Sequence, residues 1–248
     1  MTLNEQSPEF VTRADGVRLA YRHLPGNGPA VVFLPGYMSD MQGGKALALA
    51  TWARAHSRAM LRLDYSGCGE SDGAFEDGTL DIWRDDVLAV IKQATTGPVI
   101  MIGSSMGGWL MLLVAQALGS QLKALVGIAA APDFTDWDFG GADRAEIESK
   151  GRIERPSEYG YGPMVITRSF WESGQDNLQL NSDIALDCPV RLIHGQADPD
   201  VPWETSMRLA KQLRSSDVQT ILIKDGDHRL SRDQDITLLI ETVTKLVV

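Results

Sequence analysis

The segment Gly103-Ser104-Ser105-Met106-Gly107-Gly108 sets a serine between an apolar run and a helix-like run. Residues 99–102 are apolar and partly β-branched, which is typical of a buried parallel strand. Residues 109–115 are apolar nearly all round, as in a buried helix. A serine at such a junction takes a strained, exposed conformation, and glycine two positions before and after it lets the neighbouring backbones approach. The pattern predicts an α/β fold that presents Ser105 as a nucleophile.

A serine hydroxyl is a weak nucleophile at neutral pH, so it needs a base, and the base needs an acid to orient it. Among the four histidines of the chain, His228 lies between a predicted strand (218–223) and the last predicted helix. Asp198 lies just past another predicted strand (190–193). Ser, Asp, His is one of the known chain orders of a catalytic triad. The sequence therefore predicts a triad of Ser105, Asp198 and His228.

Other residues compete for the roles of acid and base. Asp200 lies two residues beyond the predicted acid, but it leads into a predicted helix and fits the strand-end position less well. Glu204 is a more distant third candidate. We interpret His23 and His56, which precede the serine, as structural. His194 heads the loop of the predicted acid, and we interpret it as a residue that shapes the turn.

Stabilisation of an oxyanion requires two backbone N–H groups close to the nucleophile. The amide of Met106, at a helix N-terminus, is the first candidate. The second is the amide of Tyr37, in the loop after predicted strand 30–34, where Gly36 permits a sharp turn. Each such donor contributes on the order of 3–4 kcal/mol to transition-state stabilisation. The side chain of Tyr37 has no part in this role, and packing alone is an adequate explanation for it.

Predicted strands and helices alternate along most of the chain. This alternation predicts an α/β fold with a mainly parallel central sheet flanked by helices. Ligands of such sheets bind outside the carboxyl ends of the strands, where the predicted triad residues also fall. The further predicted segments are a hairpin of strands 10–13 and 17–23, a strand at 59–63, helices at 44–56 and 79–91, and a strand at 124–130.

The alternation breaks at residues 132–187, which is longer than a normal connection. We predict a core of residues 1–131 and 188–248, with 132–187 inserted as a cap between the sixth and seventh core strands. We interpret Arg152 and Arg155 of this insertion as solvated surface residues, not ligands of a substrate carboxylate. The candidate substrate-binding residues are Met38, Trp137, Phe139, Tyr161, Phe170 and Trp171, of which we expect two or three to meet the substrate.

Composition narrows the choice of partners and compartment. A net charge of −10 and a pI near 4.8 argue against binding to nucleic acid or an anionic membrane. Two cysteines give no disulfide framework, and we interpret Cys68 as structural. Residues 1–10 lack the features of a signal or transit peptide, and no apolar stretch approaches the ~20 residues of a membrane span. We expect a cytoplasmic monomer or homodimer that uses no metal or organic cofactor.

Three segments carry a resemblance to a known family. Residues 34–41 with Lys45-Ala46, residues 64–71 and residues 103–109 resemble the α/β-hydrolase superfamily. Within it they resemble the subgroup of a mitochondrial palmitoyl-protein thioesterase and acyl-glucuronide esterase and its bacterial relatives. The resemblance covers the chain from residue 10 to the C-terminal helix. It implies that Ser105, Asp198 and His228 act as nucleophile, acid and base, the roles already assigned from the residues.

The chemistry that we expect is hydrolysis of carboxylic esters or thioesters of small to medium acyl groups through an acyl-enzyme. The substrate is then a small molecule or an acylated protein. Carbon–carbon bond hydrolysis or acyl transfer by the same triad is an alternative. A ligand-binding protein on a hydrolase scaffold is another, which an intact triad disfavours. A serine at position 105 excludes the enzymes of this fold that use an aspartate nucleophile.

Overall fold

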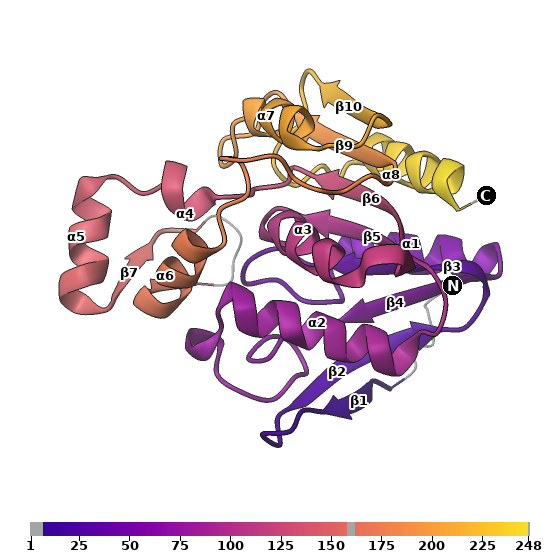
Figure 1. Ribbon diagram of the computed structural model, residues 1–248, viewed down its shortest axis with the longest axis horizontal. Helices are drawn as coiled ribbons and strands as arrows, with labels where there is room; N and C mark the ends of the chain where they lie inside the picture. The colour runs from indigo at the N-terminus through magenta and orange to yellow at the C-terminus, as the bar shows by residue number, and fades with distance from the viewer. Residues whose placement is uncertain (1–6, 158–161, 248) are drawn as a thin grey trace.

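A computed structural model describes residues 7–157 and 162–247 (Figure 1). Its centre is an eight-stranded sheet in the order β1-β2-β4-β3-β5-β6-β9-β10. β2 pairs antiparallel with β1 and β4, and the other neighbours pair parallel. The strands are β1 (Glu9–Thr12), β2 (Arg18–Leu24), β3 (Asn27–Leu34), β4 (Arg58–Leu63), β5 (Val99–Ser104), β6 (Leu122–Ile128), β9 (Val190–Gly195) and β10 (Val218–Ile223).

Helices cover both faces of the sheet, each burying an apolar side. One hydrophobic cluster joins the sheet to α2 (Leu80–Ala94), α3 (Met106–Leu118) and α7 (Glu204–Gln212). A second joins the opposite face to α1 (Gly44–Ala55) and α8 (Asp233–Leu246). α3 lies against the sheet with its first ten residues buried, as its almost wholly apolar sequence requires. The predicted α/β architecture is thus confirmed.

Local signals account for most element boundaries. Thr79 caps α2, and its side chain accepts a hydrogen bond from the amide of Ile82 at 3.2 Å. The strand predicted from residue 30 begins earlier, at Asn27. Asn27 pairs with Arg58 of β4, and a register shift separates this pair from the regular pairing that starts at Val31. β3 therefore begins with an irregular segment rich in turn-forming residues. Two short 3₁₀ helices lie in connections of the main fold: η1 (Phe75–Asp77) between β4 and α2, and η2 (Gly119–Gln121) between α3 and β6.

The chain between β6 and β9 leaves the main sheet and projects to the left in Figure 1. β7 and β8 form a separate antiparallel pair. Buried side chains of this segment, including Ile147, Ile153 and Ile166, belong to the same hydrophobic cluster as α2 and α3, so it packs directly on the rest of the molecule. The elements here are α4 (Phe134–Trp137), α5 (Gly141–Lys150), β7 (Arg152–Arg155), β8 (Met164–Thr167) and α6 (Arg168–Asp176).

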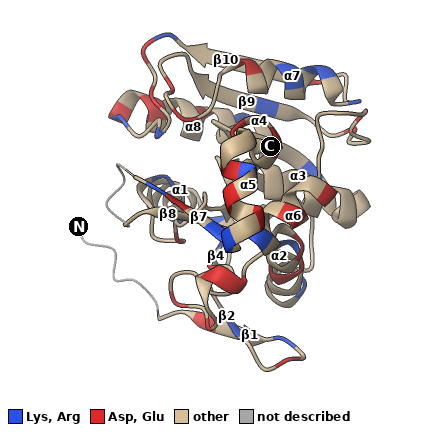
Figure 2. Cartoon of the chain, turned by 90° about the vertical axis from the view of Figure 1, so that its left-hand side faces the viewer, with Lys and Arg blue, Asp and Glu red and all other residues tan. Residues whose placement is uncertain are grey.

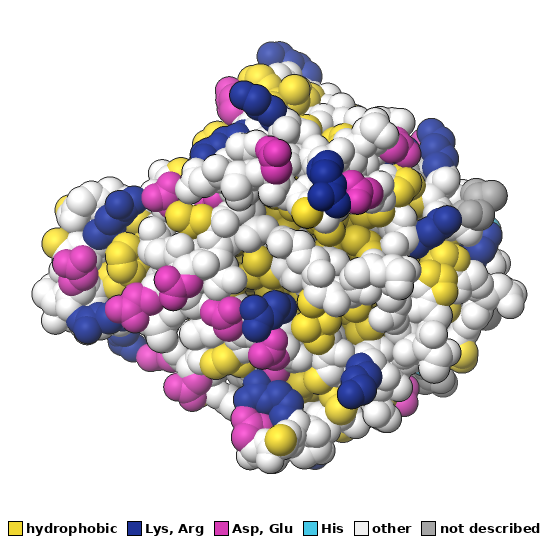
Figure 3. Space-filling model, viewed as in Figure 1, with side chains coloured by type: hydrophobic (Ala, Val, Ile, Leu, Met, Phe, Trp, Pro, Cys, Tyr) yellow, Lys and Arg dark blue, Asp and Glu magenta, His cyan; other side chains and the backbone are white. Residues whose placement is uncertain are grey.

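Residues of both charges, Lys and Arg in blue and Asp and Glu in red, occur along the side of the chain that faces the viewer in Figure 2. One ion pair links it to the preceding part of the chain: Arg152 of β7 lies 3.0 Å from Glu76 of η1. On the face viewed in Figure 3, hydrophobic side chains show among charged and polar ones. None of the described helices combines the length and the apolar character that crossing a membrane requires.

Candidate active site

Ser105 occupies a strained turn between β5 and α3. Its φ of 55° and ψ of −124° are rare for a residue with a side chain. Backbone hydrogen bonds on both sides hold the turn: the Ser105 amide donates to Ile128 at 2.9 Å, and the Ser105 carbonyl accepts from Gly108 at 2.8 Å and Ala131 at 3.0 Å. Parallel pairing of β5 with β6 thus fixes the predicted nucleophile at the carboxyl edge of the sheet.

Glycines around Ser105 leave room for backbone segments that touch one another. A Cβ at Gly107 would lie 2.4 Å from the carbonyl oxygens of Leu34 and Pro35. A Cβ at Gly103 would lie 2.3 Å from the carbonyl oxygen of Gly107. Real Cβ atoms do not approach so closely, so only glycine fits at either position. Gly107 therefore lets the turn pack against the end of β3 and the loop that follows it, and Gly103 lets β5 pack against the start of α3.

The structure brings the three predicted triad residues together. His228 Nε2 lies 3.0 Å from Ser105 Oγ, and His228 Nδ1 lies 2.8 Å from Asp198 Oδ2. The other oxygen of Asp198 accepts from the amides of Asp200 and Val201, both at 2.9 Å. Burial raises the pKa of Asp198, but hydrogen bonds from the neighbouring histidines and the Val201 amide outweigh it and hold this pKa below its usual range. Asp198 is therefore a carboxylate at neutral pH, suited to stabilise a charged imidazole.

The two predicted oxyanion donors flank Ser105. Met106 is the first residue of α3, so its amide belongs to the free N–H groups of a helix N-terminus. A Cβ built on Gly36 would lie 3.3 Å from Cβ of Ser105, which brings the loop holding the Tyr37 amide against the nucleophile. The Tyr37 hydroxyl donates to the carbonyl of Val165 in β8 at 2.7 Å, so its side chain ties this loop to the inserted segment.

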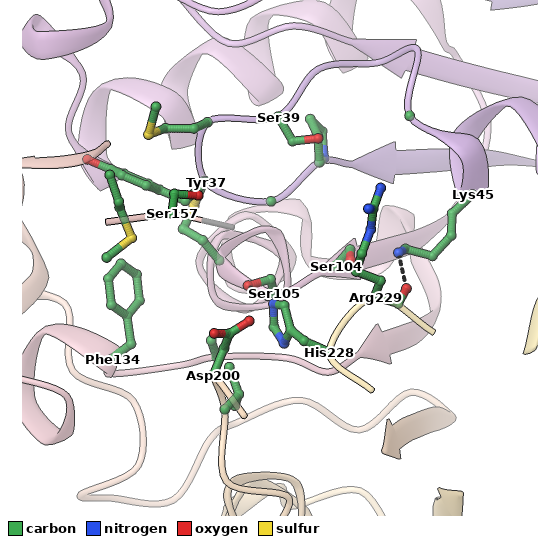
Figure 4. A pocket seen from close by; sticks show the side chains of 18 of the residues that line it. Tyr37, Ser39, Lys45, Ser104, Ser105, Phe134, Ser157, Asp200, His228 and Arg229 are labelled. Atoms are coloured by element: carbon green, nitrogen blue, oxygen red, sulfur yellow. Dashed lines mark hydrogen bonds between the residues drawn. The ribbon is translucent and has the colours of Figure 1, made fainter. Parts of the chain in front are cut away.

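A cavity of about 560 Å³ opens beside Ser105 and His228. Both hydrophobic and charged side chains line it. In the view of Figure 4, Tyr37 and Phe134 lie on one side of Ser105, and Lys45 and Arg229 on the other. The apolar lining includes Met38, Met106, Phe134, Trp137 and Met164, and the charged lining Asp40, Lys45, Asp138, Arg155, Asp200 and Arg229.

Residues 31–239 match the sequence profile of the Alpha/beta hydrolase family. The chain belongs to this family. It is similar to the human protein named "Palmitoyl-protein thioesterase ABHD10, mitochondrial", with 42% identity over 97% of this chain and 80% of that protein. Among solved structures, mouse alpha/beta hydrolase domain-containing protein 10 matches with a TM-score of 0.91 and 41% identity, covering 98% of both chains.

A bacterial structure is equally similar in shape. The putative hydrolase from Agrobacterium vitis matches this α/β hydrolase with a TM-score of 0.92 and 37% identity, covering 98% of this chain and 99% of that one. These relatives, which are named as thioesterases or hydrolases, show that the chain is a hydrolase enzyme.

The expected cytoplasmic location is contradicted by the same comparisons. The human relative is named as mitochondrial, and so are the bovine and mouse proteins of that name. The expectation rested partly on the low cysteine content, which excludes a disulfide framework but does not separate one reducing compartment from another.

Cys68 itself is buried, and burial raises the pKa of its thiol to about 12.

The structure places some of the candidate substrate-binding residues at the cavity of this α/β hydrolase and others away from it. Met38 and Trp137 line the cavity. Phe139 and Phe170 do not line it, and both belong to the hydrophobic core, with exposures of 3% and 1%. Trp171 is also outside the cavity, and its indole N–H donates to the carbonyl of Thr135 at 3.1 Å. The sixth candidate, Tyr161, lies outside the described residues.

Sequence reasoning missed several cavity residues. Arg155 lines the cavity and pairs with Asp138 at 2.6 Å and Asp143 at 2.8 Å, whereas we had interpreted it as a solvated surface residue. Lys45 of α1 lines the cavity and donates to the carbonyl of Arg229, the residue after His228. Its place within a motif of the family resemblance was the only signal that could have marked it.

Of the remaining histidines, His23 and His56 do not line the cavity, whereas His194 contacts the predicted acid. His56 Nδ1 lies 2.8 Å from the carbonyl of Trp52, one turn earlier. His23 lies within β2, opposite Leu61 of β4. His194 is fully buried beside the predicted acid, with Nε2 3.2 Å from Asp198 Oδ2. Its contact with the acid goes beyond shaping a turn.

One group of described residues has the donor atoms to hold a metal ion. Ligand atoms of Asp198, Asp200 and His228 lie within 4.8 Å of one another. Both oxygens of Asp198 already accept hydrogen bonds, one of them from His228. A metal ion here would compete with the pairing between the acid and the base. The residues therefore fit a proton-transfer site better than a metal site.

Proposed function

We propose that this α/β hydrolase cleaves carboxylic ester or thioester bonds, with Ser105 as nucleophile, His228 as base and Asp198 as the acid. One observation carries the proposal. Hydrogen bonds of 3.0 and 2.8 Å join Ser105 Oγ to His228 and His228 to Asp198, at the wall of a cavity large enough for a small-molecule substrate. The relatives named as palmitoyl-protein thioesterases support the thioester class.

The first half-reaction forms an acyl-enzyme. Ser105 Oγ attacks the substrate carbonyl carbon while His228 Nε2 accepts the hydroxyl proton. The oxyanion accepts hydrogen bonds from the amides of Met106 and Tyr37. When the intermediate collapses, the bond from the carbonyl carbon to the leaving oxygen or sulfur breaks. The protonated His228 then gives its proton to the departing alcohol or thiol, and the acyl group remains on Ser105.

The second half-reaction uses water. His228 Nε2 accepts a proton from a water molecule whose oxygen attacks the acyl carbon. Collapse of the second tetrahedral intermediate breaks the bond to Ser105 Oγ, which takes back the proton from His228. The products are a carboxylic acid and free enzyme. Throughout, Asp198 holds the imidazole through Nδ1 and stabilises its positive charge.

The placement of Tyr37 and Phe134 on one side of Ser105 and of Lys45 and Arg229 on the other supports one orientation of the substrate. The apolar acyl chain lies against Phe134, Trp137 and Met164, where water is displaced from hydrophobic surface. The leaving group lies toward Lys45 and Arg229, on the other side of Ser105 (Figure 4). An acyl group attached to a small molecule and one attached to a protein both suit this orientation, since the leaving group points away from the apolar end.

Residues 132–187 serve as a cap over this site, inserted into a core of residues 1–131 and 188–248. Two contacts support this role. The inserted segment supplies Trp137 and Met164 to the cavity wall. The backbone carbonyl of Val165, in the same segment, also accepts a hydrogen bond from the hydroxyl of Tyr37, whose amide is one of the proposed oxyanion donors. The position of the cap and the geometry of the oxyanion site are thereby coupled.

Hydrolysis of p-nitrophenyl esters and acyl thioesters of graded chain length tests the proposal. We expect turnover by the unchanged enzyme, with an optimum set by the apolar side of the cavity. Ser105→Ala should lower kcat by about a millionfold. Ser120→Ala, which changes an exposed serine of η2, is the matched control and should keep full activity. Equal activity of the unchanged protein and Ser105→Ala would rule the proposal out.

A further inference from the structure

His194 lies near the end of β9, in contact with Asp198. The side chains of His194 and Asp198 are both fully buried. His194 Nε2 lies 3.2 Å from Asp198 Oδ2 and 3.1 Å from the carbonyl oxygen of Val201. His194 Nδ1 lies 2.7 Å from the hydroxyl oxygen of Ser206 in α7. Both ring nitrogens are thus within hydrogen-bond distance of polar groups in a dry environment.

These contacts determine where the proton of His194 resides. A carboxylate and a carbonyl can only accept hydrogen bonds, so Nε2, which faces both, must carry a hydrogen. A hydroxyl can donate, so Nδ1 of a neutral ring accepts from Ser206. The neutral Nε2–H tautomer therefore satisfies every partner. The opposite tautomer would set a ring lone pair against two acceptors in a buried site, which is unfavourable.

Asp198 consequently sits among donors on all sides. Oδ1 accepts from two backbone amides, and Oδ2 faces His228 Nδ1 at 2.8 Å and His194 Nε2 at 3.2 Å. The two histidines share one oxygen of the acid. A hydrogen bond from His194 to this oxygen reduces the negative charge that Asp198 offers to His228, because hydrogen bonds to a carboxylate stabilise its charge.

We propose that His194 is a positioning residue of the catalytic machinery: its neutral Nε2–H group fixes the carboxylate of Asp198 and limits how strongly that carboxylate attracts a proton onto His228. This inference rests on the proposed triad. His194 does not touch the substrate or Ser105; it acts through Asp198. Its effect is to keep His228 unprotonated, and so able to act as a base, down to a lower pH than Asp198 alone would allow.

Few other polar groups face His194. The titratable side chain in contact with it is Asp198, from the loop after β9, and His228 is reached through that carboxylate. Ser206 contacts it from α7. On β10, the residue paired with His194 is Leu222, which does not titrate. Asp200, near Asp198 and His228, is the next charge in the same loop.

Two amide variants separate the two ring nitrogens. In His194→Gln the side-chain amide reaches the position of Nε2 and keeps a donor toward Asp198. In His194→Asn it reaches only the position of Nδ1 and loses that donor. We expect the acid limb of the pH profile of kcat/KM to stay in place in His194→Gln. In His194→Asn it should move to higher pH by roughly half a unit, with KM little changed.

Ser206→Ala is the matched control. It removes a buried hydroxyl from the same cluster but leaves Nε2–H facing Asp198, so the pH profile should not move. If His194 only shapes the loop, His194→Asn and Ser206→Ala should lower stability without moving the acid limb. An unmoved acid limb in folded His194→Asn would therefore overturn the proposal.

The tautomer can be measured without turnover or substitution. Nitrogen NMR of the ¹⁵N-histidine-labelled unchanged protein distinguishes Nε2–H, Nδ1–H and doubly protonated rings. At pH 8 we expect one buried histidine in the neutral Nε2–H form, with its shift perturbed when a phosphonate modifies Ser105. A histidine at this position in the Nδ1–H or charged form would overturn the proposal. This readout is independent of whether the protein hydrolyses esters.

Discussion

The proposed acid of the triad shows how much backbone geometry decides at the scale of one residue. Asp198 and Asp200 are two positions apart in one loop, and both carboxylates approach His228. Asp198 Oδ2 lies at hydrogen-bond distance from His228, and the amides of Asp200 and Val201 hold its other oxygen. Asp200 thus contributes its backbone to the acid, while its side chain lines the cavity.

Asparagine at each position distinguishes the two roles. Asp198→Asn keeps the shape of the side chain but offers His228 an amide that favours the wrong tautomer, so kcat should fall about 10,000-fold. Asp200→Asn should stay within about tenfold of the unchanged enzyme, because its backbone amide remains. Steady-state kinetics on one p-nitrophenyl ester measures both. A larger loss in Asp200→Asn than in Asp198→Asn would assign the acid to Asp200.

The turn between β5 and α3 shows at the scale of an element why the serine motif predicts so well. Its glycines let the turn touch β3, and β3 leads into the loop with the Tyr37 amide. The contact between Gly107 and β3 therefore helps to set the spacing of the two proposed oxyanion donors. The turn itself depends on residues within six positions of each other, so the sequence pattern predicts it, whereas its contact with Leu34 and Pro35 joins segments far apart in the sequence.

Gly107→Ala tests this contact. The added methyl would lie 2.4 Å from two carbonyl oxygens, so the turn or the β3 loop must shift. We expect a loss of roughly 2 kcal/mol in the free energy of unfolding, together with lower kcat. Gly141→Ala, at the start of α5 with nothing within 4 Å, is the control and should be neutral or slightly stabilising. Urea unfolding measures both, and equal effects would contradict the account.

The cavity lining was harder to predict, because it depends on contacts between distant parts of the chain. Phe170 turns into the core because it meets the rings of Tyr37 and Trp83, which lie far from it in sequence. Arg155 reaches the cavity through its pairing with Asp138 and Asp143 across the inserted segment. Neither an aromatic spacing nor a charge pattern encodes which side of a short helix or strand faces inward. The order of the proposed triad residues and the serine motif can both be recognised in the sequence without knowledge of such distant contacts.

At the scale of the whole molecule, a buried carboxylate joins the loops that surround the site. Asp64, after β4, accepts from the amide of Met41 at 2.7 Å and from that of Glu70 at 2.9 Å. Burial raises its pKa to about 6, against the lowering effect of these hydrogen bonds. A raised pKa means that the folded state favours the protonated form. The stabilising contribution is therefore full below about pH 4 and is lost as the pH rises through 6.

Asp64→Asn tests this linkage, because asparagine cannot ionise. The variant carries a constant penalty for its altered hydrogen bonds. Its free energy of unfolding relative to the unchanged protein should improve by about 2 kcal/mol between pH 4 and pH 7. Urea unfolding at several pH values in this range gives the difference. A difference that does not vary with pH would show that Asp64 titrates alike in the folded and unfolded chains.

The central claim is that Ser105 is the nucleophile of a working hydrolase, and active-site labelling tests it most directly. A fluorophosphonate reacts with a serine only when base and oxyanion donors activate it. Labelling of the folded protein, mapped by peptide mass spectrometry, should place the modification on Ser105 and abolish ester hydrolysis in proportion to the fraction modified. Full activity after complete reaction, or labelling at another serine with loss of activity, would contradict the account.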